Sequence, residues 1–391
     1  MAEQSRAVAL MMAVVALAVV GAVTEKVGPQ PITHVATTDI TDMMNPGPDR
    51  RMELPGFDPE FVDFPHYIIR ITERIWHHRE VELCLEYYGG EAAIHTLAGD
   101  ITGAQTVVDN TYATLKAFPD RRLEADNVVW SKDGDTFYSS HLITSKMTNL
   151  GDSEFGPATG KAVRVLTVAD CACFENRIIE EWLVRDNMGL VQQLGLDPDA
   201  VALKQAEADQ KKGFSLPDFH ANARAAIDTA PLVALEARAS SESAAVKVLV
   251  AALNKIWNLR SLEGLDEIYD YRVSAHVPGA RDLYGHDQLA NFFRPVLGAL
   301  NSTRLQVQHI AEIPYLGEAR DVAIRWAVSG VHETDGLYGA STGLPVYIMG
   351  VTQARVMNGR IREEWTVWDD IAIRRQVAYK RLSVEARTIR A

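Results

Sequence analysis

A seven-residue motif occurs twice in the chain, and each copy ends in an aspartate. Residues 180–186 and 363–369 both read Glu-Glu-Trp-x-x-x-Asp, and each follows a short turn and an apolar stretch. The pattern predicts the last strand of a sheet, with Asp186 or Asp369 at its end. An aspartate at the mouth of a curved sheet is partly removed from water, which raises its pKa and lets it take up and return a proton. The competing interpretation is that each aspartate caps the helix that follows it.

Histidines at matching places in both halves are the next candidates for chemistry. His95 and His276 both fall on the first strand expected in their half. An imidazole there could donate to a developing enolate oxygen or orient an acid–base partner. A buried structural histidine is the alternative, since duplication preserves structure as readily as function. The halves then differ, because the second has His332 on a later strand and the first has His141 instead.

Internal repetition sets the domain plan. Residues 75–79 match residues 256–260 at an offset of 181, and residues 156–160 match residues 339–343 at an offset of 183. One hairpin loop of different length accounts for the drift of two residues. The predicted parts are a leader at 1–59, a first domain at 60–196, a helical connector at 197–242 and a second domain at 243–385.

Each copy is expected to start with helices and to continue as hairpin-linked strands. Apolar residues recur at three- and four-residue spacing in 68–76 and 244–259, which predicts amphipathic helices. Later, Lys132 to Asp135 is a strong hairpin turn between two apolar runs. This order predicts an α+β fold, as two tandem cone-shaped α+β barrels. In each, a curved, mostly antiparallel sheet would wrap over its helices and enclose a pocket for a small molecule.

These features together resemble the SnoaL-like polyketide cyclase and ester cyclase family of the nuclear-transport-factor-2-like superfamily. The resemblance rests on the helix, the histidine-bearing first strand, the Gly-x-x-Thr-Gly turn and the Glu-Glu-Trp-x-x-x-Asp strand, and it covers both copies. It implies an acid–base role for Asp186 and Asp369 and a pocket position for His95 and His276. Residues 329–332 are similar to the family's Thr-Gly-x-His strand. The second copy therefore keeps the fuller constellation, and Asp369 with His332 and His276 is the preferred catalytic set.

Aromatic side chains are too numerous to contact a ligand all at once, and most are expected in the cores. Those near the repeated motifs, with a few polar neighbours, are candidates for substrate binding. In the first copy they are Trp76, Tyr88, His141 and Trp182, and in the second they are Trp257, Tyr269, Tyr284, Arg325 and Trp365.

Composition excludes several classes of protein. A net charge of −13 and a pI near 5.3 argue against a nucleic-acid partner. The chain has no Gly-rich phosphate loop after a strand, no Gly-x-Ser-x-Gly elbow and no His-Glu-x-x-His set, so neither a cofactor nor a metal is expected. The three cysteines, Cys84, Cys171 and Cys173, are expected to be core thiols rather than disulfides.

These inferences favour a cofactor-free small-molecule enzyme. It would use Asp/His acid–base chemistry on a carbonyl-bearing, aromatic or polyketide-like substrate, as a cyclase, isomerase or lyase. The alternative is a non-catalytic small-molecule-binding or assembly module of the same fold. In both cases the two copies would form an intramolecular pseudo-dimer, with further homo-oligomerisation left open.

The N-terminal residues bear on location. Residues 7–23 are uncharged and apolar and follow Arg6, which predicts an exported or membrane-tethered protein whose only membrane contact is this segment. The lack of a disulfide framework favours the cytoplasmic alternative. Residues 24–59 are rich in Pro, Thr, Asp and Gly and are expected to form an extended leader that adds little to a core.

Overall fold

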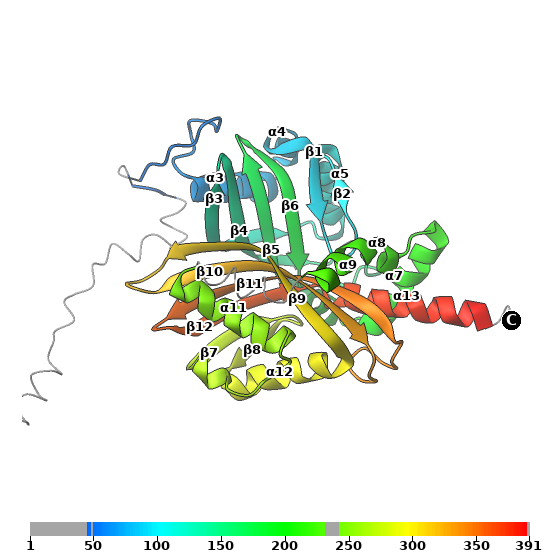
Figure 1. Cartoon of the computed structure of the whole chain (residues 1–391). Coiled ribbons are helices and arrows are strands. Elements are labelled where there is room, and N and C mark those ends of the chain that lie inside the picture. Colours follow the sequence, from blue (N-terminus) through cyan, green and yellow to red (C-terminus); the bar gives the residue numbers. More distant parts are fainter. Residues whose placement is uncertain (1–44, 48–49, 231–241, 389–391) are drawn as a thin grey trace, which may run out of the picture.

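The computed structural model describes residues 45–47, 50–230 and 242–388. The apolar segment at 7–23 lies outside the described residues. Within the described part, no helix is both long and apolar enough to cross a membrane. Figure 1 shows two lobes, each a sheet with helices against it, and the strands of one sheet run across those of the other.

The first domain opens with helices that lie over the concave side of its sheet. Helix α3 (Phe64–Thr72) begins at Asp63, whose carboxylate accepts the backbone N–H of His66 at 2.8 Å. It continues into a π-helical turn, η2 (Glu73–His77). The remaining elements are η3 (Val81–Leu83), α4 (Cys84–Tyr87), β1 (Tyr88–His95), β2 (Ile101–Thr102), α5 (Ala104–Ala117), β3 (Arg122–Asp133), β4 (Thr136–Thr148), β5 (Ala162–Phe174), β6 (Arg177–Arg185) and α6 (Asn187–Gln193).

The second domain repeats this plan. Helix α11 (Ala244–Trp257) begins at Ser243, whose hydroxyl accepts the N–H of Val246. Its further elements are η4 (Leu265–Glu267), β7 (Tyr269–Val277), β8 (Arg281–Tyr284), α12 (Gly285–Ala299), β9 (Leu300–Pro314), β10 (Arg320–His332), β11 (Leu344–Met357), β12 (Arg360–Trp368) and α13 (Asp370–Thr388).

The two sheets share one topology. Their strand orders are β2-β1-β6-β5-β4-β3 and β8-β7-β12-β11-β10-β9. Only the β1/β6 and β7/β12 pairs are parallel, and all other neighbours within the described sheets are antiparallel. The predicted α+β class and the tandem repeat are confirmed. Both sheets are open and curved rather than closed barrels.

Polar and charged side chains join the outer faces of the two sheets. Arg325 of β10 donates to the Asp170 carboxylate of β5 at 2.5 Å, and both side chains are buried. The guanidinium also lies 3.3 Å from the centre of the Trp182 ring. Gln353 donates to the Ser140 carbonyl across the same interface at 2.8 Å. The two copies therefore form a pseudo-dimer within one chain, through a buried and hydrogen-bonded contact.

The connector between the copies is helical over its described residues. It contains α7 (Pro198–Lys212), α8 (Leu216–Phe219) and α9 (Ala221–Thr229). Helix α7 lies along α13 of the second domain, where Arg375 forms a two-point ion pair with Asp209 at 2.5 and 2.6 Å (Figure 1). Because Asp209 is almost fully buried, this contact holds the connector against the second domain.

The last part of the leader belongs to the first core. Phe57 packs edge-on against Tyr67 and Phe137, with ring centres 4.9 and 5.6 Å away. Met52 and Leu54 pack on the same cluster. The expectation that residues 24–59 add little to a core is therefore wrong for this final stretch. All three cysteines are buried and free, as expected.

Candidate functional site

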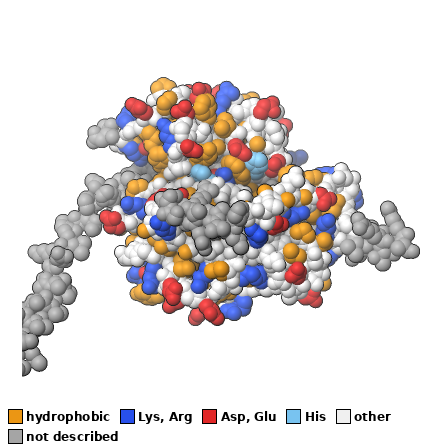
Figure 2. Space-filling model, viewed as in Figure 1, with side chains coloured by type: hydrophobic (Ala, Val, Ile, Leu, Met, Phe, Trp, Pro, Cys, Tyr) orange, Lys and Arg blue, Asp and Glu red, His pale blue; other side chains and the backbone are white. Residues whose placement is uncertain are grey.

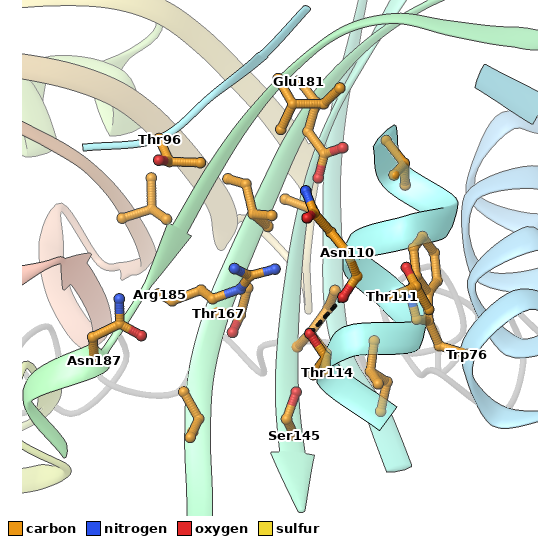
Figure 3. A pocket seen from close by; sticks show the side chains of 18 of the residues that line it. Trp76, Thr96, Asn110, Thr111, Thr114, Ser145, Thr167, Glu181, Arg185 and Asn187 are labelled. Carbon is orange, nitrogen blue, oxygen red and sulfur yellow. Dashed lines mark hydrogen bonds between the residues drawn. The ribbon is translucent and has the colours of Figure 1, made fainter. Parts of the chain in front are cut away.

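A cavity of about 510 Å³ lies inside the first domain, between the concave face of the sheet and helices α3 and α5. Most of its wall is apolar, with Ile68, Ile94 and Val165 among the lining residues. Figure 3 shows polar side chains projecting into this space from α5 and from the central strands of the sheet. Mostly apolar lining with a few directed polar groups is typical of a small-molecule site.

A buried carboxyl group stands at one end of the cavity. Glu181 of β6 accepts a hydrogen bond from the Tyr88 hydroxyl at 2.9 Å. Burial raises the pKa of Glu181, while the Tyr88 hydrogen bond and the nearby charge of Arg185 oppose the rise. In Figure 3 the Glu181 carboxyl and the Asn110 side chain point into the same part of the cavity. A raised carboxyl pKa beside open space suits a group that takes and returns protons.

Two buried polar atoms that β4 contributes to the cavity wall have no hydrogen-bond partner within the described residues. They are Nε2 of His141 and Oγ of Ser145, both on β4. Burial lowers the pKa of His141 to about 3, so its imidazole is neutral near pH 7. A buried polar atom without a partner is costly, and a polar ligand in the cavity would relieve that cost.

The second domain fills the equivalent space with aromatic rings. Trp257, Trp326 and Trp368 are all buried, and their ring centres lie 5.6 to 6.2 Å apart. Phe292 and Phe293 of α12 pack on Trp368. The concave face of the second domain is therefore a packed core, whereas that of the first encloses a cavity.

Strand register identifies the substitutions behind this difference. In the first sheet Ile143 pairs with Thr167, which pairs with Arg185. In the second sheet Trp326, Gly350 and Trp368 occupy the same three cross-strand positions, each 183 residues later in the sequence. A Cβ at position 350 would collide with the Trp326 ring, so this glycine makes room for the aromatic filling.

The aspartate that ends the first motif is held by backbone. Asp186 accepts N–H groups from Gly189, Gly279 and Ala280 at 2.9, 2.8 and 2.7 Å. It caps α6 and ties the β7–β8 turn of the second domain to the end of β6. Burial raises its pKa, and these three hydrogen bonds oppose the rise. The helix-cap interpretation describes this geometry, and the catalytic role of Asp186 stays a prediction.

The aspartate that ends the second motif lines the cavity of the first domain. Asp369 accepts the side-chain amide of Asn187 at 2.6 Å and the backbone N–H of Ala372 at 3.1 Å. Burial raises its pKa to about 7, and these hydrogen bonds oppose the rise. Asp369 and Met349 both come from the second domain, which therefore completes one wall of the cavity.

Replacing Asp369 by Asn should make stability less dependent on pH. The folded-state pKa is raised, so the native protein binds the proton more tightly than the unfolded chain does. The associated stability is present below the unfolded pKa near 3.8 and is lost as pH rises through about 7. Relative to wild type, Asp369→Asn should therefore gain stability between pH 4 and pH 8, by up to about 4 kcal/mol. Urea denaturation of both proteins across this range measures the difference, and a constant difference would contradict the prediction.

The paired histidines lie on the outer faces of their sheets. His95 contacts Glu180 at 2.9 Å and Asp100 at 3.0 Å, and its ring lies against Trp182. His276 contacts Asp282 at 2.7 Å and is stacked on Trp365. Hydrogen bonding to Glu363 and Asp282 raises the pKa of His276. Neither histidine lines the first-domain cavity.

His332 anchors a loop at the end of β10. Its side chain is fully buried, and Nδ1 lies 3.2 Å from the Thr342 hydroxyl. The residue 183 positions earlier, Asn149, holds Thr159 in the same manner. No hydrogen bond or ion pair joins His332, His276 and Asp369 to one another within the described structure. The preferred catalytic set is thus not brought together in one place, and its role remains a prediction.

The predicted substrate-binding residues divide among several places. Trp76, Tyr88 and His141 line the first-domain cavity. Trp182 and Arg325 lie between the sheets, Trp257 is in the second core, and Tyr284 is exposed. Tyr269 donates to Glu364 in the second core at 2.9 Å. Trp365, with His276 and Asp186, lines a hollow of about 350 Å³ between the domains.

The sequence reasoning missed Glu181. Side chains alternate along a strand, so Glu181 faces the concave side of β6 and its neighbour Trp182 faces the other sheet. That alternation was available from the sequence. A second signal was the replacement of Thr167 and Arg185 by Gly350 and Trp368, which marks the copy whose pocket is filled.

The chain is built from two nuclear-transport-factor-2-like domains in tandem. The cavity of the first domain has the lining expected of a site for a small molecule. The model of the SnoaL-like polyketide cyclase family matches residues 66–194 and 247–377. The chain belongs to this family, and its family relationship and fold support a small-molecule enzyme.

Several solved structures are similar to one domain of the chain, whereas no curated protein matches it. One is a proposed polyketide cyclase from Acidithiobacillus ferrooxidans, with 20% identity over 35% of this chain and 95% of that chain and a TM-score of 0.31. Another is IdmH, a proposed polyketide cyclase from Streptomyces antibioticus, with 23% identity over 33% of this chain and 94% of that chain and a TM-score of 0.28. A third is AclR, a proposed hydroxylase from Streptomyces galilaeus, with 20% identity over 33% and 92% and a TM-score of 0.29.

Proposed function

We propose that the protein is a cofactor-free acid–base enzyme acting on a small carbonyl compound in the cavity of the first domain. The observation that carries the proposal is the buried Glu181 carboxyl, held by Tyr88 at the end of a cavity of about 510 Å³. The cavity wall suits an aromatic or polyketide-like substrate, because most of its side chains are apolar. The second domain supports the first and supplies Asp369 and Met349 to the cavity wall.

In this mechanism Glu181 is the proton-transfer group. Its carboxylate takes a proton from the carbon next to the substrate carbonyl, which leaves an enolate and a neutral Glu181. The side-chain amide of Asn110 points from α5 into the part of the cavity that the Glu181 carboxyl faces, and it would stabilise the enolate oxygen. The enolate carbon then either attacks a second carbonyl, whose alkoxide takes the proton from Glu181, or a conjugated enolate takes that proton back at a different carbon. These two outcomes correspond to a cyclase and an isomerase, and loss of a β-substituent from the enolate would give a lyase.

Among the aspartates of the repeated motif, Asp369 is retained in the proposal. It lines the cavity, and its pKa of about 7 allows it to exchange a proton near neutral pH. It would serve as a second proton carrier at the wall made by the second domain. Asp186 has no such role in the proposal, because three backbone N–H groups occupy its carboxylate.

The chain offers a matched control for Glu181. Both domains contain the same Tyr–Glu hydrogen bond, Tyr88–Glu181 in the first and Tyr269–Glu364 in the second, each at 2.9 Å. Only the first of these pairs faces the cavity. Glu181→Gln should therefore lower turnover by roughly 10²- to 10⁴-fold. Glu364→Gln should change stability to a similar degree and leave turnover intact.

The assay follows proton exchange rather than a particular product. A panel of aromatic and polyketide-like ketones is incubated in deuterated water, and exchange at the carbon next to the carbonyl is followed by NMR. The proposal fails if Glu181→Gln exchanges a bound ketone as fast as the wild type does. Ketones that bind in the cavity without exchange or turnover in any variant would favour the alternative, a non-catalytic binding module.

A further inference from the structure

Two arginines in the cavity wall lack any counter-ion. Arg121 directly precedes β3 and Arg185 ends β6, and both line the first-domain cavity. Arg121 is only 9% exposed, and its Nε has no hydrogen-bond partner. Within the described residues neither side chain forms an ion pair, and neither donates a side-chain hydrogen bond. Burial and the positive charge of Arg185 lower the pKa of Arg121 to about 9.

Several other buried or half-buried arginines in the described residues are paired with carboxylates. Arg325 is paired with Asp170, Arg355 with Asp321, and Arg375 with Asp209, in each case at 3.0 Å or less. A buried guanidinium without a partner costs several times more than a paired one. Arg224, which is also buried and forms no ion pair in the described part of the chain, donates to the Pro217 carbonyl at 2.7 Å, so Arg121 differs from it in making no side-chain hydrogen bond.

The carboxyl groups of the cavity do not neutralise the arginines. Glu181, Glu154 and Asp369 also line it. Glu181 is bonded to Tyr88, while Asp369 accepts from Asn187 and from the backbone. None of the three lies within ion-pair distance of either arginine, so both guanidinium groups remain available to a ligand.

Comparison of the two copies shows whether the fold itself requires these two arginines. Strand register aligns Arg122 with Arg304, 182 residues later, so the residue before it, Arg121, corresponds to Thr303. Arg185 corresponds to Trp368, 183 residues later. The fold thus forms without arginine at either position. Both arginines occur in the copy that has a cavity, and both are absent from the copy whose concave face is filled.

We infer that the first-domain cavity binds a substrate that carries a carboxylate, with Arg121 and Arg185 as the residues that hold it. This inference rests on the proposed function in that the same molecule bears the reacting carbonyl. The planar fork of a guanidinium matches a carboxylate in two-point geometry. The apolar remainder of the wall suits a ring-bearing body attached to that single anionic group.

The test is calorimetric titration with ligands that differ only in the polar group. 2-Naphthoic acid, 2-naphthamide and 2-naphthyl phosphate serve as probes at constant ionic strength and neutral pH. Wild-type protein should bind the acid roughly 10- to 100-fold more tightly than the amide, as expected for charge-assisted hydrogen bonds. Arg121→Gln and Arg185→Gln should each remove most of this preference. Arg122→Gln and Arg177→Gln change exposed neighbours on β3 and β6 and should retain it.

Ligand-free stability shows whether the variants are folded. Arg121→Gln removes an unpaired buried charge, so its Tm without ligand should rise, on the order of 2–4 °C. A folded Arg121→Gln variant that keeps the full preference for the acid would overturn the inference. So would wild-type protein that binds the amide or the phosphate as tightly as the acid.

The titration also separates this inference from the proposed function. Glu181-dependent exchange of neutral ketones without any preference for carboxylates would leave the function standing and remove the inference. The opposite result is a carboxylate preference that depends on Arg121 and Arg185, together with normal proton exchange by the Glu181→Gln variant. It would support the inference and contradict the proposed function.

Discussion

Transplanting the aromatic filling of the second domain into the first should abolish ligand binding and turnover while the protein stays folded. The variant combines Ile143→Trp, Thr167→Gly and Arg185→Trp. These are the residues that β10, β11 and β12 carry in the same cross-strand positions. Two indole rings would occupy much of the cavity of about 510 Å³, and the glycine would make room for the first of them. Calorimetry with the naphthalene probes and the exchange assay both measure the loss.

Two further proteins make this result interpretable. Thr167→Gly alone enlarges the cavity and should bind and exchange ligands within a few-fold of wild type. Asn110→Phe with Thr111→Phe fills the cavity from α5, as Phe292 and Phe293 do on α12, and it leaves Arg185 in place. If either filled variant is folded by thermal denaturation and still turns over ketones at the wild-type rate, the site lies elsewhere.

Asp170→Asn should lower the free energy of unfolding by about 3–5 kcal/mol. Asp170 is the counter-ion of Arg325 at 2.5 Å, and both side chains are buried between the two sheets. Burial raises the pKa of Asp170 to about 6, and Arg325 opposes the rise. At pH 8 the carboxylate is charged, so its removal leaves the Arg325 guanidinium buried and unpaired against Trp182. Urea denaturation at pH 8 measures the loss.

An exposed ion pair provides the comparison. Glu124→Gln breaks the contact with Lys146 at 3.6 Å, where both side chains are about half exposed, and should cost less than about 1 kcal/mol. Arg325→Met with Asp170→Leu removes both charges and should recover much of the stability lost in Asp170→Asn. A cost for Asp170→Asn no larger than that for Glu124→Gln would show that the inter-sheet pair contributes little.

Much of the architecture was accessible from sequence because it depends on periodic patterns. Apolar runs beside turn residues located the hairpins, and helical spacing located α11 and the α3–η2 segment. The repeated motif fixed the number of copies. The parallel β1/β6 and β7/β12 pairs were not predicted, because they join strands far apart in sequence. No local pattern encodes such a contact.

The site was harder to predict because both copies carry the same motif in different surroundings. Trp76, Tyr88, His141 and Asp369 do line the cavity. His95 and His276 were placed on the correct strands, but the face of each strand was not considered, and both rings contact the tryptophans of the motif instead. The cavity itself depends on side-chain volume at Ile143, Thr167 and Arg185 together. The combined volume of side chains from three strands can be judged only once the register of those strands is known.

The covalent link between the copies explains how one pocket could be lost without harm to the other. In a symmetric homodimer of a single domain, one gene encodes both pockets, and a tryptophan at the position of Trp326 would close both at once. Here the two halves vary independently, so the second can specialise in packing while it supplies Asp369 and Met349 to the wall of the first. Single active sites should therefore be commoner among fused pairs than among dimers of the same fold. The first domain produced alone would lack part of its own wall.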